Sequence, residues 1–114
     1  MTHTDESAAL LEAAQKLADG LAQSQLYSNY LQTKAELEKD TALCRRVAEY
    51  KKICAAYEEK LQAGCSNFEQ EKHISHLFAG LTLNPVTGQF LEAESAILKV
   101  CCGILEIISN GVEM

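Results

Sequence analysis

Residues 84–110 have the sequence NPVTGQFLEAESAILKVCCGILEIISN, and the rest of the chain must pack around them. Asn84 is a favoured N-cap residue, and Pro85 suits the first helical position because its missing N–H would have no partner there. At helical spacing the segment carries two adjacent apolar rows: Phe90, Ala93, Ile97, Val100, Ile104 and Ile107, then Leu91, Leu98, Cys101, Leu105 and Ile108. A helix with such a wide apolar surface must be covered from several sides, so this one is predicted to be central to a bundle or to a subunit interface.

Four further helical segments are predicted upstream, from apolar residues repeated at intervals of three and four and from capping residues at their ends: about 5–23, 24–39, 41–63 and 67–82. The third has the most regular pattern, a heptad seam of Leu43, Val47, Tyr50, Cys54, Tyr57 and Leu61. Gly64 then suits a left-handed residue after its end. The chain is therefore predicted to be all-α, an elongated antiparallel bundle of about five helices forming one domain over residues 1–114.

Composition narrows the class of protein. The chain has 114 residues, 47% of them hydrophobic, with one Pro and six Gly, which is typical of a single helical domain. Its net charge of −6 opposes direct contact with nucleic acid and with anionic lipid. The richest apolar run, residues 96–108, is shorter than the ~20 residues that a membrane span requires. We therefore expect a soluble, cytoplasmic protein that neither enters membranes nor binds nucleic acid directly.

Two groups of residues leave a metal- or redox-dependent function open as the alternative. His73 and His76 are three positions apart on one helix, close enough to share a metal ion, but no third ligand has suitable spacing. The five cysteines lack the spacing of a zinc site or a disulfide framework: Cys44, Cys54, Cys65, Cys101 and Cys102. The favoured interpretation is that most are small buried hydrophobes, with Cys102 on a polar stripe, and that the chain has no cofactor.

The basic residues concentrate on the third predicted helix, at Arg45, Arg46, Lys51 and Lys52. Because acidic residues are interleaved with them, the favoured interpretation is a solvated face, with a docking patch for an acidic partner as the alternative. No nucleophile with an orienting base and no converging carboxylates can be argued from spacing. The chain is therefore predicted to be non-enzymatic, with no catalytic residue.

The chain resembles the YlbF/YmcA (control of competence regulator) family of small helical bacterial proteins. The resemblance is strongest over residues 81–86, LTLNPV, and residues 90–94, FLEAE, which match the link and the start of that family's last helix. It continues upstream through residues 14–21, Ser24, Tyr27, Tyr30 and the third helix, so it covers nearly the whole chain.

The resemblance implies a helical protein that self-associates and acts through partners, including family paralogues and an endoribonuclease complex. Such members influence messenger-RNA processing, with effects on competence, sporulation and biofilm development. Some members carry further cysteines after the last helix that are linked to iron–sulfur binding, and none follows Asn110 here.

A homodimer or larger homo-oligomer is predicted, because five helices cannot cover both apolar rows of the last helix as well as the seam of the third. The interface is predicted to use the last helix and part of the third. The expected contact residues are Phe90, Ala93, Ile97, Leu98, Val100, Ile104, Leu105 and Ile107.

Overall fold

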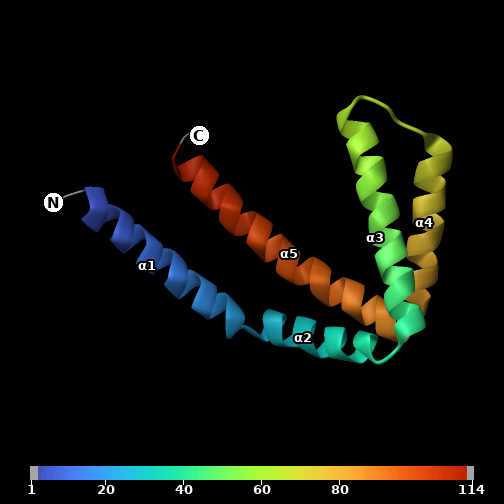
Figure 1. The fold of residues 1–114 in the computed structure, drawn as a ribbon, viewed down its shortest axis with the longest axis horizontal. Helices are drawn as coiled ribbons and strands as arrows, with labels where there is room; N and C mark the ends of the chain where they lie inside the picture. Colours follow the sequence, from blue (N-terminus) through green and yellow to red (C-terminus); the bar gives the residue numbers. More distant parts are fainter. Residues whose placement is uncertain (1–2, 113–114) are drawn as a thin grey trace.

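The computed structural model describes residues 3–112, which form five α-helices and no strand (Figure 1). The helices are α1 (His3–Ala22), α2 (Gln25–Glu38), α3 (Thr41–Gln62), α4 (Phe68–Leu83) and α5 (Pro85–Gly111). The prediction of an all-α chain with a long C-terminal helix is confirmed. Each predicted helix agrees with the observed one to within two residues at either end.

The helices form two arms that meet at a corner (Figure 1). One arm holds α2 packed beside α5, with α1 continuing beyond α2 toward the end of the molecule where both termini lie. The other is the α3–α4 hairpin, whose loop is at the opposite end. The radius of gyration is 18.5 Å, whereas a compact domain of this length has about 13 Å. The predicted elongated arrangement is therefore correct.

The predicted capping residues begin the helices. Ser24, Asp40 and Asn67 each accept a hydrogen bond from the backbone N–H three residues ahead, at 3.1 to 3.2 Å. Asn84 accepts from the N–H groups of both Val86 and Thr87. Each bond satisfies a helix-terminal N–H that has no partner within its own helix. After α3, Gly64 has a φ of 85°, the left-handed conformation that favours glycine.

The α4–α5 junction is fixed by two residues of the α5 first turn. The Thr87 side chain is fully buried, and its hydroxyl donates to the Leu81 carbonyl at 2.5 Å, so α5 satisfies a C-terminal carbonyl of α4. Gly88 allows the helices to approach closely, because a Cβ there would lie 2.9 Å from the Thr82 carbonyl oxygen. These two contacts set the direction in which α5 leaves the corner.

The core lies at that corner. Leu37, Val47, Leu81 and Phe90 form one buried cluster, so α2, α3, α4 and α5 each contribute one side chain. The Tyr30 ring packs against the Phe90 ring with centroids 5.8 Å apart, which joins α2 to α5. No described side chain of α1 contributes to this cluster. The corner is therefore the well-packed part of the molecule, and the ends of the arms extend away from it.

Candidate interaction surfaces

More than half of the large exposed apolar side chains lie on α1, on the C-terminal half of α5 and at the residue that follows α5. We call the surface that they form the arm surface, and its large exposed side chains are Leu10, Leu11, Leu17, Leu98, Leu105, Ile107, Ile108 and Val112. All side chains from residue 5 to residue 20 are exposed, so most of α1 has no cover from its own chain. Exposed apolar surface of this kind is typical of protein–protein interaction sites.

A groove of about 300 Å³ runs between the two helices of the arm surface. Ala14, Leu17, Ala18 and Leu21 line it from α1, and Cys101, Ile104 and Leu105 line it from α5. Every lining side chain is apolar or a thiol. The groove therefore has the same chemistry as the apolar grooves that receive amphipathic helices in other proteins.

The expected interface residues of α5 divide into two groups. Phe90 and Ile97 are only 5% and 8% exposed because α2 and the corner cover them, so in this conformation they belong to the core of the chain itself. Ala93, Val100 and Ile104 are half-buried. Leu98, Leu105 and Ile107 are exposed, at 53%, 64% and 73%. Only the C-terminal half of the predicted row is thus open to a partner.

The seam of α3 is used within the chain. Val47 and Tyr57 are buried, and Tyr50 packs against Phe78 of α4 with ring centroids 6.0 Å apart. Leu61, at the tip of the hairpin, is exposed. The α3 helix therefore has little exposed apolar surface for the predicted role in an oligomer interface. The α1 helix, in contrast, is exposed along nearly its whole length, although the sequence analysis predicted no interface there.

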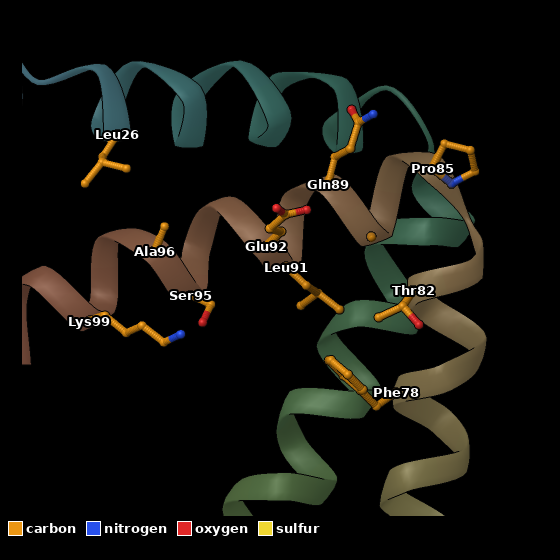
Figure 2. A pocket seen from close by; sticks show the side chains of 11 residues that line it. Leu26, Phe78, Thr82, Pro85, Gln89, Leu91, Glu92, Ser95, Ala96 and Lys99 are labelled. Carbon is orange, nitrogen blue, oxygen red and sulfur yellow. The ribbon is translucent and has the colours of Figure 1, made fainter.

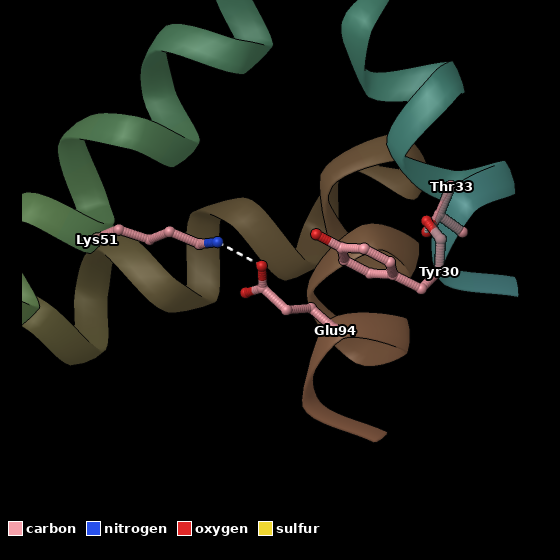
Figure 3. A network of polar contacts seen from close by, with 4 residues as sticks. All are labelled: Tyr30, Thr33, Lys51 and Glu94. Carbon is pink, nitrogen blue, oxygen red and sulfur yellow. Dashed lines mark hydrogen bonds and ion pairs between the residues drawn. The ribbon is translucent and has the colours of Figure 1, made fainter. Parts of the chain in front are cut away.

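The four basic residues predicted as a possible docking patch, Arg45, Arg46, Lys51 and Lys52, have different surroundings in the structure. Lys51 forms an ion pair with Glu94 of α5 (Figure 3), and its Nζ lies 5.2 Å from the centroid of the Phe90 ring. This side chain therefore links α3 to α5, although 46% of it is still exposed. Arg45, Arg46 and Lys52 are exposed, and both arginines line a groove between α3 and α4.

A broad hollow of about 770 Å³ lies where α2, α4 and the first half of α5 meet (Figure 2). Leu26 and Phe78 are at its two sides, and the α5 side chains that face it include Glu92, Ser95 and Lys99. These three belong to the polar stripe of α5 and are exposed. The Ser95 hydroxyl forms no hydrogen bond with Glu92 or Lys99, so neither side chain is placed to activate it as a base.

The histidines and cysteines do not assemble into a metal site within the described residues. His73 and His76 are both exposed on α4, and no group of three or more His, Cys, Asp or Glu residues there is placed to hold a metal ion. Cys44, Cys54 and Cys101 are half-buried, whereas Cys65 and Cys102 are exposed. None of the five forms a disulfide. Nor does the described part of the chain contain a helix long and apolar enough to cross a membrane.

Known proteins share this fold and sequence pattern. A family model described as "Control of competence regulator ComK, YlbF/YmcA" matches residues 10–113. UPF0342 proteins of Caldicellulosiruptor bescii and Caldicellulosiruptor saccharolyticus are each 26% identical, and the matches span 90% of this chain and 87% of theirs. Bacillus subtilis RicA, solved by crystallography in complex with RicF, has a similar fold, with a TM-score of 0.59. It is 24% identical, with 94% of this chain and 96% of that chain covered. The match over residues 10–113 shows that the chain belongs to the YlbF/YmcA family.

Proposed function

We propose that this chain is a non-enzymatic regulatory adaptor that acts by protein–protein contact through its arm surface. It self-associates as a dimer or larger homo-oligomer, and it contacts other proteins, including family paralogues. The observation that carries the proposal is the exposed apolar face shared by α1 and the C-terminal half of α5. The complex of the similar protein RicA with RicF supports a role in protein assemblies.

The exposed area of the single chain supports a partner of substantial size. The accessible surface is 8743 Å², whereas a compact monomer of 12.5 kDa exposes about 6,200 Å². The chain therefore exposes about 2,500 Å² more than a compact monomer of its mass. A standard protein interface removes about 800 Å² from each partner, and obligate ones remove more. The open shape therefore leaves enough surface for one large interface or for two standard ones.

The exposure of α1 also supports a partner at the arm surface. In proteins most of the stability of a helix such as the 20-residue α1 comes from packing its amphipathic face against another element. The α1 helix has its leucines on a recognisable face but buries little of it within the chain. A partner that fills the groove between α1 and α5 supplies that missing contact.

The adaptor serves a complex that processes RNA and thereby affects competence, sporulation or biofilm development. Membership of a family of competence regulators supports this assignment. The chain itself does not touch the RNA, because its net charge of −6 opposes phosphate contact. The exposed arginines and Lys52 are too few to offset that charge.

Light scattering of the purified protein tests the proposal. The wild type at micromolar concentration should have at least twice the chain mass of 12.5 kDa, and Leu105→Glu should reduce that mass because it places a charge in the interface. Leu83→Glu is the matched control, since Leu83 is 85% exposed at the corner, away from the arm surface. Circular dichroism should show both variants to be helical.

A wild-type protein that is monomeric at micromolar concentration contradicts self-association. An equal loss of mass in both variants contradicts the assignment of the interface to the arm surface.

A further inference from the structure

We propose that the groove between α3 and α4 is a second docking site, which binds a short acidic segment of a partner protein that carries one large apolar side chain. This inference rests on the proposed adaptor function and adds the chemistry of a partner at a surface distinct from the arm surface. The combination that carries it is two exposed arginines, without ion pairs to any described residue, beside an apolar depression.

The groove has a volume of about 310 Å³, near the lower limit for a binding pocket. Ala42, Arg45 and Glu49 form one ridge of α3, and Arg46 and Tyr50 form the ridge beside it. Leu77 and Leu81 of α4 are the opposite wall. Such a depression holds one apolar anchor side chain, the arrangement that concentrates binding energy in protein interfaces.

The arginines have no competing partner within the described chain. Lys39 pairs with Glu36 and Lys51 pairs with Glu94, but neither Arg45 nor Arg46 forms an ion pair or hydrogen bond with a described residue. Arg46 extends across to α4, where a Cβ added at Gly80 would lie 3.8 Å from its Nη2 atom. A guanidinium held over a groove is suited to bind a carboxylate through two parallel hydrogen bonds.

Glu49 makes the two ends of the groove differ in charge. It is one helical turn beyond both arginines on α3 and lines the same groove. The partner's carboxylates therefore belong at the Arg45–Arg46 end, and a hydroxyl, amide or basic side chain belongs opposite Glu49. A segment that is acidic throughout would place one of its charges against Glu49, which lowers its affinity.

A protein segment fits this groove better than a nucleic acid. The depression is walled by leucines, which make no favourable contact with phosphate or ribose. Two arginines beside a glutamate, on a chain of net charge −6, fall short of the run of cations that binds a phosphate backbone. The Tyr50 side chain is half-buried against Phe78, so its ring is not presented to stack on a base.

Selection from a random peptide display library, followed by fluorescence anisotropy on the selected peptides, tests the proposal with the whole protein. Peptides enriched on the wild type should contain at least one Asp or Glu next to a Leu, Ile, Met or Phe. Arg46→Glu should weaken their binding about tenfold or more. Ala42→Leu, which fills the groove without changing its charge, should weaken it too. Lys52→Glu is the control, because Lys52 is an exposed cation of the same helix that does not line the groove.

Undiminished binding to Arg46→Glu, or enrichment of peptides without acidic residues, overturns the proposal. So does tight binding of a fluorescein-labelled 12-nucleotide oligouridylate that Arg46→Glu abolishes, because the site then recognises nucleic acid. Light scattering separates the two proposals: Arg46→Glu should retain the wild-type mass, whereas Leu105→Glu should lose mass and keep its peptide affinity.

Discussion

Replacing Gly88 by alanine tests whether the first turn of α5 lies as close to the α4 backbone as it does in the structure. The added Cβ would lie 2.9 Å from the Thr82 carbonyl oxygen, a separation too short for a carbon and a backbone oxygen. That oxygen belongs to the backbone of α4, so it cannot move aside as a flexible side chain would. The two helices would have to separate slightly at the corner that holds the core.

Two opposing effects determine the size of the change. Alanine is more favourable than glycine inside a helix by about 1 kcal/mol, partly because it restricts the unfolded chain. Forcing a methyl group into a closely packed contact costs about 1–3 kcal/mol. The free energy of unfolding of Gly88→Ala should therefore fall by up to about 2 kcal/mol.

Gly103→Ala is the matched control. Gly103 is in the same helix, and a Cβ there would meet no atom within 4 Å, so only the favourable effect of about 1 kcal/mol remains. Urea denaturation followed by circular dichroism, at one protein concentration, should separate the two variants by about 1–3 kcal/mol. If Gly88→Ala is stabilised as much as Gly103→Ala, the close approach of α5 to α4 is wrong.

Three further predictions concern single contacts. Thr87→Val removes the hydroxyl that donates to Leu81 O and keeps the size of the side chain, so it should lower the free energy of unfolding by about 1 kcal/mol. Equal stability of Thr87→Val and the wild type would contradict this prediction. Asp40→Ala removes the α3 N-cap and should cost about 1 kcal/mol in urea denaturation, with Asp40→Asn close to wild type. Burial, with the Cys54 side chain beside it, raises the pKa of Tyr50 to about 12 from its usual 10.0. Because the neutral phenol is favoured in the folded chain, it contributes stability that is complete below pH 10 and is lost as the pH rises to about 12. Phenylalanine has no such group to ionise. The Tm of Tyr50→Phe should therefore fall less between pH 10 and pH 12 than the Tm of the wild type. An unchanged slope would contradict this.

The helices could be predicted closely because their signals are local. Asp40 and Asn84 each cap the helix that follows within three residues, and Gly64 adopts its positive φ at the end of α3. These interactions depend on the few residues around them, so a single sequence contains all the information they need. The close fit at Gly88 could not be predicted in this way, because it depends on the backbone of another helix.

The interface could be predicted only in part, because spacing along a helix does not say which segment of an apolar row its own chain covers. Phe90, Ile97, Ile104 and Ile107 belong to one apolar row of α5, at intervals of seven or three residues. The chain covers the first two, because α2 is short and lies beside the N-terminal half of α5, and it leaves Ile107 exposed. Likewise, the leucines of α1 have the same periodicity as a core helix. Only the arrangement of the helices in space shows which apolar helix face is buried within the chain and which is left exposed.

The two proposed surfaces belong to different arms. The arm surface is on α1 and α5, and the groove is between α3 and α4, which form the other arm (Figure 1). The small core of Leu37, Val47, Leu81 and Phe90 and the Lys51–Glu94 ion pair connect them. One chain can therefore hold a second subunit and an acidic segment at the same time, since neither contact requires residues of the other. At the corner between the two arms, Thr87 and Gly88 fix the angle between α4 and α5. In the proposed adaptor, the geometry of that junction would set the relative position of the two partners.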